Sequence, residues 1–244
     1  NRRNQSTSRA VRCDRTALLH AYASVATRGD GRTRYGAPMK SISPSKIVCV
    51  GRNYAKRAAE LGGEVPDEPL IFFKPPSSII GEADSIVMPA ISQRVDFEGE
   101  IGVIIGKQGR NVAASDAWDH VEALVPVNDV TARDLQSIDD QWARAKGFDT
   151  FCAVGTPVPV GDVDRATLGV ITRVNGEVLQ EGDAADMVFD IPTIIEYITS
   201  IMTLEPGDLV ATGTPEGVAP LKDGDVVEIE VVGVGSVRNP VIQG

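Results

Sequence analysis

The chain has 244 residues, of which 42% are hydrophobic and 24% charged, a composition typical of a folded protein long enough to bury one full core. Its formal net charge of -10 disfavours non-specific nucleic-acid binding, which needs a basic surface. No apolar run approaches the roughly 18 to 20 residues of a membrane helix, and three widely spaced cysteines fit neither a disulfide framework nor a cysteine-based zinc site. We therefore expect a protein of a reducing compartment, the cytoplasm, that binds neither nucleic acid nor membrane.

Residues 1–38 differ in composition from the rest of the chain. They contain eight arginines, no lysine and two acids, and Met39 stands directly after them. An Arg-rich, acid-poor segment is typical of a transit peptide, which would place the protein in the mitochondrial matrix. We favour the alternative that Met39 is the true start and that residues 1–38 are a disordered or non-native leader. Residues 39–244 are then expected to form a single domain.

Short apolar runs bounded by Gly and Pro dominate the chain after Ser45. They predict strands over residues 46–50, 70–73, 85–88, 99–105, 123–128, 169–174, 208–212 and 225–232. Asn175-Gly176 predicts a hairpin, because this dipeptide supplies the positive φ angles of a type I′ turn.

Helices are fewer, and we expect them over residues 53–61, 116–122, 131–145 and 190–202. The last of these begins at Asp190, a favoured N-cap, and carries isoleucines at helical spacing. Many strands without regular strand-helix alternation argue against a doubly wound parallel sheet. We predict an α+β, mostly β fold, with an antiparallel, barrel-like or sandwiched core and peripheral helices.

Glu98 and Glu100 are two residues apart in a predicted strand, so their side chains share a face, opposite Phe97, Ile101 and other core residues. Asp129 follows another strand-like run. Three carboxylates that lie close together suit Mg²⁺ or Mn²⁺. The alternative is a solvated strand face that holds no metal.

Arg133 and Gln136 are three residues apart on the helix after Asp129 and share a face. Next to a cation, they suit a substrate that has a carboxylate and a carbonyl. The alternative is a surface helix on which Arg133 pairs with Asp134 or Asp139.

Three further segments have both a functional and a structural interpretation. Lys146 begins a loop after this helix, and Thr214 lies in a Gly-rich turn that could hold an oxyanion or could be a plain turn. Arg57 and Glu60 could form an exposed ion pair on the helix over residues 53–61, or Glu60 could be a general base at the metal.

Six motifs occur in the order seen in the fumarylacetoacetate hydrolase family, and the chain resembles the compact, acylpyruvase-like branch of this family over about residues 45–241. The motifs are Gly51-Arg52-Asn53-Tyr54-Ala55, Phe72-Phe73-Lys74-Pro75, the segment from Asp96 to Gly102, the segment from Asn128 to Gln136, Ala145-Lys146-Gly147-Phe148-Asp149, and the segment from Thr212 to Val218.

The resemblance implies a rolled, barrel-like mixed β-sheet, usually in a homodimer that binds Mg²⁺ or Mn²⁺. By position, Glu98, Glu100 and Asp129 match the metal ligands. The residues that match those holding the substrate or orienting water are Arg133, Gln136, Lys146 and Thr214. Glu60 matches the acid of a His-Glu pair, on a mobile lid helix, that activates the attacking water.

This chain departs from the family pattern Asn-Tyr-Ala-x-His-x-x-Glu, because Arg57 stands where the His is expected. Arginine stays protonated and cannot act as a base. General-base assistance is worth roughly 10² to 10⁴ in rate, so hydrolysis that relied on the pair should be slow or should rest on Glu60 alone.

We expect a divalent-metal-dependent hydrolase that cleaves the C–C bond of acylpyruvate-type 2,4-dioxo acids such as fumarylpyruvate. The alternative, favoured by Arg57, is an oxaloacetate decarboxylase or tautomerase, or a 2-hydroxymuconate-type isomerase, because these reactions share metal-enolate chemistry and need no activated water. An alternative of another class is a protein that binds the metal and a 2-oxo acid with weakened catalysis.

Overall fold

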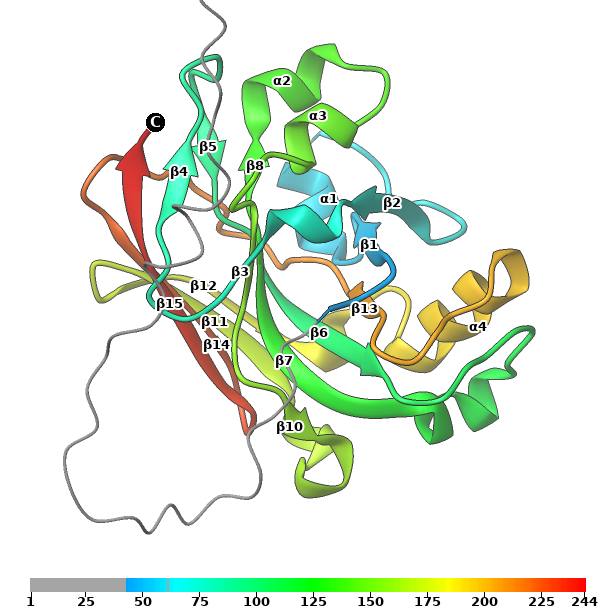
Figure 1. Ribbon diagram of the computed structural model, residues 1–244. Helices are drawn as coiled ribbons and strands as arrows, with labels where there is room; N and C mark the ends of the chain where they lie inside the picture. The colour runs from blue at the N-terminus through cyan, green and yellow to red at the C-terminus, as the bar shows by residue number, and fades with distance from the viewer. Residues whose placement is uncertain (1–42, 61) are drawn as a thin grey trace, which may run out of the picture. The chain divides into compact units, whose positions relative to one another are not determined.

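The computed structural model describes residues 43–60 and 62–244 (Figure 1). The leader predicted over residues 1–38 lies outside the described residues, so the proposed division of the chain stays a prediction. Within the described ranges, no helix is long and apolar enough to cross a membrane.

Strands make up most of the regular structure. They are β1 (Ile47–Gly51), β2 (Leu70–Lys74), β3 (Ile79–Ile80), β4 (Ile86–Met88), β5 (Val95–Asp96), β6 (Gly99–Ile105), β7 (Val121–Asp129), β8 (Thr131–Ala132), β9 (Cys152–Val154), β10 (Val158–Pro159), β11 (Gly169–Val174), β12 (Glu177–Asp183), β13 (Leu209–Ala211), β14 (Val226–Val231) and β15 (Gly235–Gln243). The α-helices are α1 (Ala55–Glu60), α2 (Arg133–Ile138), α3 (Ala143–Lys146) and α4 (Ile191–Ile201).

The larger sheet has the order β2-β1-β13-β6-β7-β9-β3, with β10 beside β7, and it curls into a half-barrel (Figure 1). The second sheet has the order β12-β11-β14-β15-β4, and β5 pairs with β8. Most neighbours are antiparallel, whereas β1 and β13, β3 and β9, and β4 and β15 run parallel. The predicted mostly β, α+β fold with a barrel-like sheet is confirmed.

Local signals predicted the hairpin and the longest helix well. Asn175 and Gly176 have φ angles of 53° and 86° in the turn that joins β11 to β12. In α4, the Asp190 side chain accepts a hydrogen bond from the Thr193 N–H at 2.9 Å, and most of the spaced isoleucines are buried. Ile201 is the exception, with 49% of its surface exposed.

The helix predicted over residues 131–145 is wrong as a continuous element. α2 ends at Ile138 because Asp139 has extended backbone angles, and α3 begins only at Ala143. The Asp139 side chain accepts a hydrogen bond from Arg144 Nε at 2.8 Å across this break. The helix predicted over residues 116–122 is also wrong: residues Ala114–His120 form a 3₁₀ helix, and β7 begins at Val121.

Strand β6 carries the acidic pattern into the interior, because every residue from Gly99 to Ile105 is buried. Phe97, Ile101, Val103 and Ile105 pack in the larger hydrophobic core, as predicted. On the other face of the strand, Ile104 packs in a second hydrophobic core, and Glu98 and Glu100 are only 6% and 1% exposed. A solvated strand face at Glu98 and Glu100 is therefore excluded.

Candidate active site

Glu98, Glu100 and Asp129 form a buried acidic triad. The antiparallel pairing of β6 with β7 sets Gly99 opposite Asn128, which brings the ends of both strands together. One carboxylate oxygen of each acid lies within 4.8 Å of the others, and the residues are 6%, 1% and 0% exposed. Three acids so close in a low-dielectric interior are unfavourable unless positive charge balances them.

Two observations show that this triad fits a hard divalent cation. Asp129 Oδ1 accepts no hydrogen bond among the described residues, although Lys74 Nζ lies 2.7 Å away. The pKa of Glu100 is raised well above its usual value by burial and by the nearby negative charges of Asp129 and Glu98. A cation bound by three carboxylates would use the open oxygen and relieve this repulsion, and Mg²⁺ and Mn²⁺ prefer such oxygen ligands.

Lys146 bridges two acids of the triad. Its Nζ donates to Glu98 Oε2 and to Asp129 Oδ2, each at 2.6 Å. Burial alone would lower the pKa of Lys146, but the charges of Asp129 and Glu98 raise it above its usual value. Lys146 is therefore a charged hydrogen-bond donor to these two acids.

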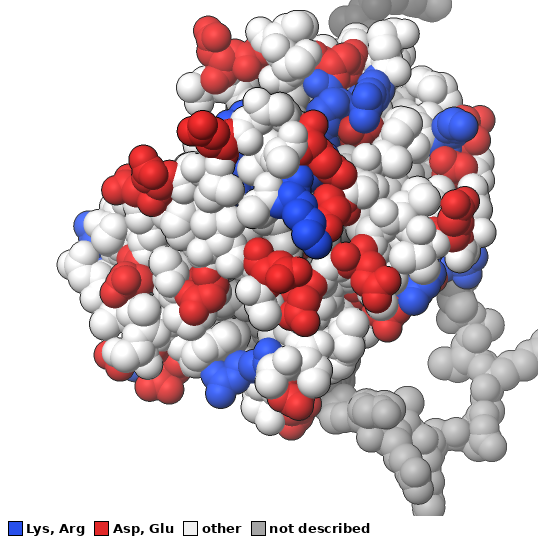
Figure 2. Space-filling model, turned by 180° about the vertical axis from the view of Figure 1, so that it is seen from behind, with Lys and Arg blue, Asp and Glu red and all other residues white. Residues whose placement is uncertain are grey.

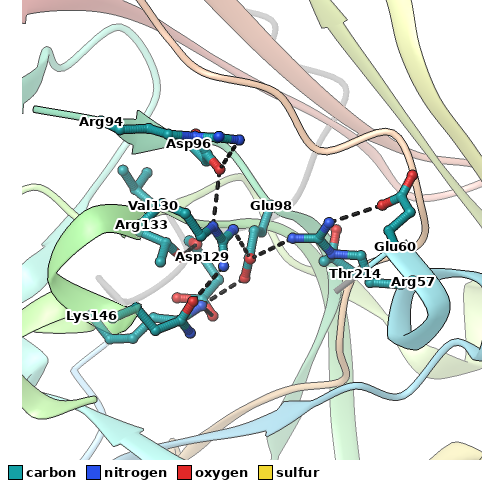
Figure 3. A network of polar contacts seen from close by, with 12 residues as sticks. Arg57, Glu60, Arg94, Asp96, Glu98, Asp129, Val130, Arg133, Lys146 and Thr214 are labelled. Atoms are coloured by element: carbon teal, nitrogen blue, oxygen red, sulfur yellow. Dashed lines mark hydrogen bonds and ion pairs between the residues drawn. The ribbon is translucent and has the colours of Figure 1, made fainter. Parts of the chain in front are cut away.

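Arg133 lies above the same acids and is held from three directions (Figure 3). Its Nε donates to Asp96 Oδ2 at 2.9 Å, its Nη2 donates to Glu98, and its Nη1 donates to Gln136 Oε1 at 2.5 Å. The shared face of Arg133 and Gln136 is confirmed. The alternative pairing of Arg133 with Asp134 or Asp139 is wrong, because these acids bind Ser92, Gln93 and Arg144 instead.

Glu98 is ionised by its neighbours. Burial favours the neutral carboxyl, but the charges of Lys146, Arg133 and Arg57 outweigh it and hold the pKa of Glu98 well below its usual value. Arg57 reaches this carboxylate from α1, with Nη2 3.5 Å from Glu98 Oε1.

Glu60 is connected to the site through Arg57 and does not line the pocket. Its Oε2 accepts a hydrogen bond from Arg57 Nη1 at 2.8 Å, and its Oε1 accepts one from the Gly217 N–H at 3.0 Å. The ion pair predicted between Arg57 and Glu60 is present, although Arg57 itself is buried. Glu60 thus ties α1 to the loop after β13.

Thr214 lies in that loop, which also supports the triad. The Gly213 N–H donates to Glu100 Oε2 at 2.9 Å, and Thr214 Oγ1 accepts a hydrogen bond from Gln180 Nε2 at 2.9 Å. Gly213 has a φ of 98°, and a Cβ there would lie 2.7 Å from the Asn53 Cβ, so glycine is required.

A pocket of about 340 Å³, including its solvent-filled mouth, opens onto the triad. Seven of the eight predicted site residues line it, and Glu60 is the exception. The other lining residues are Val50, Gly51, Arg52, Arg57, Phe72 and Trp142.

Two supporting residues were missed by sequence reasoning. Lys74 is buried and donates to the Val130 carbonyl at 3.2 Å and to the Lys146 carbonyl at 2.6 Å. Asp96 is also buried and pairs with Arg133. The signal for Lys74 was a lysine in an apolar strand run, but nothing in the run indicates which acid it meets.

The family model for the fumarylacetoacetate (FAA) hydrolase C-terminal domain matches residues 46–242. The mitochondrial oxaloacetate decarboxylase of Dictyostelium discoideum is 43% identical, over 78% of this chain and 89% of that protein. The oxaloacetate tautomerase YisK of Bacillus subtilis is 42% identical, over 81% of this chain and 70% of that protein.

A similar solved structure is that of a 2-hydroxyhepta-2,4-diene-1,7-dioate isomerase from Mycobacterium marinum. It is 46% identical with a TM-score of 0.76, and the match covers 83% of this chain and 76% of that one. The extent of these matches and the order of the motifs lead to one conclusion: this chain belongs to the fumarylacetoacetate hydrolase family.

Proposed function

We propose that this chain is a divalent-metal-dependent enzyme that tautomerises or decarboxylates oxaloacetate-type 2-oxo acids. The observation that carries the proposal is the buried acidic triad with Lys146 on one side and the Arg57–Glu60 pair on the other. The names of the similar oxaloacetate enzymes support this alternative better than the acylpyruvate hydrolysis that we first expected.

Glu98, Glu100 and Asp129 would hold Mg²⁺ or Mn²⁺. When bound, the cation would act as a Lewis acid toward the carboxylate and keto oxygen of the substrate. Arg133 supplies a guanidinium for the substrate carboxylate, oriented by Asp96 and Gln136.

The charged Nζ of Lys146 would stabilise the negative charge that develops on the keto oxygen when a bond at C3 breaks. The Thr214 hydroxyl, held by Gln180, would orient the substrate from the opposite loop. In this arrangement, Arg133 binds the carboxylate of the 2-oxo acid group, and Lys146 binds its keto oxygen.

The hydrogen bonds of Glu60 support tautomerisation or decarboxylation over hydrolysis. Both carboxylate oxygens of Glu60 already accept hydrogen bonds, one of them from an arginine that cannot take a proton. Hydrolysis needs a base that activates water, whereas tautomerisation transfers a C3 proton and decarboxylation releases CO₂, and neither of these reactions needs an attacking water. The homodimer and the cytoplasmic or mitochondrial location stay predictions.

A substrate panel tests the proposal. Purified protein with Mg²⁺ or Mn²⁺ would be given oxaloacetate, acetylpyruvate and fumarylpyruvate, and keto-enol conversion, CO₂ release and C–C cleavage would be measured separately. We expect metal-dependent conversion or decarboxylation of oxaloacetate to exceed cleavage of either acylpyruvate, and to stop with EDTA.

Faster cleavage of an acylpyruvate would restore the hydrolase interpretation. No turnover of any substrate, together with thermal stabilisation by oxalate, would instead indicate a binding protein with lost catalysis. Oxalate is a suitable probe because it resembles the enolate of pyruvate.

A further inference from the structure

Arg57 faces the pocket from the side opposite to Arg133 and Lys146, with Glu98 between them (Figure 3). Its side chain comes from α1 and is only 8% exposed. The reaction proposed above requires no proton transfer from this arginine, so burying its charge here needs another explanation. A buried cation without a full set of partners is costly unless a ligand supplies them.

The Arg57 guanidinium has donors to spare. Among the described residues, its one hydrogen bond runs from Nη1 to Glu60 Oε2 at 2.8 Å. Its Nη2 lies 3.5 Å from Glu98 Oε1, an ion pair without a hydrogen bond. A guanidinium with open donors can bind a carboxylate through two parallel hydrogen bonds.

The charge of the pocket also favours a second carboxylate on the substrate. Three acidic and four basic side chains line the pocket, and a divalent cation would add two more positive charges. A neutral histidine at position 57 would remove one of the basic charges. A substrate with two carboxylates therefore balances this lining better than a substrate with one.

We propose that Arg57 binds the second carboxylate of a dicarboxylic 2-oxo acid, and so selects such substrates over 2,4-dioxo acids that end in a neutral acyl group. This inference rests on the proposed function, which places the first carboxylate near Arg133.

Oxaloacetate and acetylpyruvate are matched substrates for a test. Both are 2-oxo acids with a methylene at C3, and the terminal carboxylate of the first replaces an acetyl group of similar size in the second. Exchange of the C3 protons with deuterium, followed by NMR in the presence of Mg²⁺, measures the same enolisation in both.

Arg57→Gln should raise the KM for oxaloacetate roughly tenfold to a hundredfold, because it removes a charged hydrogen-bonded pair. The KM for acetylpyruvate should change little. Arg57→Lys keeps the charge but not the parallel donors, so its KM for oxaloacetate should be intermediate. Lys56→Gln is the matched control: its side chain is on the same helix and 74% exposed, and we expect the wild-type preference.

A second measurement keeps the two proposals separate. Thermal stabilisation by oxalate with Mg²⁺ should persist in Arg57→Gln, because the three carboxylates of the triad and Arg133 are unchanged in this variant. If the wild type enolises neither substrate, the proposed function fails. If the wild type enolises both, the inference alone is overturned by an unchanged KM for oxaloacetate in Arg57→Gln, or by an equal loss on both substrates. Should the Gln variant not fold, an unchanged KM in Arg57→Lys overturns it.

Discussion

Glu98 has cationic side chains on both sides. One of them, Arg57, stands where the family pattern has a histidine. Lys146 and Arg133 contact Glu98 from α3 and α2, whereas Arg57 approaches it from α1 (Figure 3). A histidine at position 57 could exchange a proton with water, and arginine cannot. Under the proposed function, Arg57 thus favours tautomerisation or decarboxylation, which need no attacking water, over hydrolysis, which does.

Arg57→His is expected to raise acylpyruvate cleavage by roughly tenfold or more, because it restores a base next to Glu60. Oxaloacetate conversion should fall, because the charge at position 57 is lost. Steady-state rates of both reactions with Mg²⁺ test this. A rise of the same size for both substrates would show that position 57 has no specific role in water activation.

Sequence reasoning could predict the acids of the site but not all of their partners. Glu98 and Glu100 follow the two-residue period of a strand, and Asp129 ends the next predicted strand, so all three are expected near one sheet edge. Lys74 and Gln180 meet the site only because distant strands become neighbours in the fold. Their partners depend on sheet order, which no local period in the sequence specifies.

At the scale of elements, the loop after β13 connects the acidic triad to α1. Gly213 donates to Glu100, and Gly217 donates to Glu60, so one loop holds both the triad and the helix that bears Arg57. Such a loop depends on backbone angles that few residues adopt: φ is 98° at Gly213 and 91° at Gly217.

Gly213→Ala is expected to lower the free energy of unfolding by about 2 kcal/mol or more, through the positive φ and the contact with Asn53. It should also weaken Mg²⁺-dependent stabilisation, because the Gly213 N–H positions Glu100. Urea denaturation with and without Mg²⁺ measures both effects.

Gly161→Ala is the control for this substitution, since a Cβ there meets nothing within 4 Å. We expect its unfolding free energy to stay within about 0.5 kcal/mol of wild type. Equal stability of the two glycine variants would refute the requirement for glycine at position 213.

Element boundaries were predicted less well than element types. The break between α2 and α3 arises at Asp139, where the extended backbone and the bond to Arg144 end the helix. An apolar period continues through this segment, so the sequence favours one helix. The break matters for the site because it allows Arg133 and Lys146 to approach Glu98 from two short helices.

At the scale of the whole molecule, the acidic surface contrasts with the pocket lining, in which basic side chains outnumber acidic ones. The net charge is -10, and acidic side chains are spread over the face seen in Figure 2. Four basic side chains nevertheless line the pocket. Under the proposed function, these cations and the bound metal would attract an anionic substrate, and a raised ionic strength should weaken this attraction.

Asp208 joins β1 to β13 and gives the fold a pH dependence. Its carboxylate accepts hydrogen bonds from the Ser45 N–H at 3.0 Å, the Lys46 N–H at 3.1 Å and the Glu205 N–H at 2.8 Å, and it pairs with Lys46 Nζ. Burial favours its neutral form, but the hydrogen bonds from Lys46, Ser45 and Glu205 lower its pKa below the usual value. Its stabilising effect is thus present above the unfolded-state pKa and is lost as the pH falls through the lower folded-state pKa.

Asp208→Asn should lower the free energy of unfolding at neutral pH by about 2 to 3 kcal/mol, because it removes charged hydrogen bonds. The difference from wild type should shrink as the pH falls below the unfolded value of about 3.9. Denaturation curves across this range test the sign, with Asp119→Asn, an exposed acid, as control. A difference that stays constant with pH would contradict the account.

The most direct test of the account is the response of thermal unfolding to Mg²⁺ in wild type and in Glu98→Gln. A ligand at 100 times its Kd stabilises the folded state by about 2.7 kcal/mol, so the wild-type Tm should rise as Mg²⁺ is added. Glu98→Gln should lose this rise, whereas Glu122→Gln, which changes an exposed acid on β7 outside the triad, should keep it. An undiminished rise in Glu98→Gln would show that the triad is not the metal site.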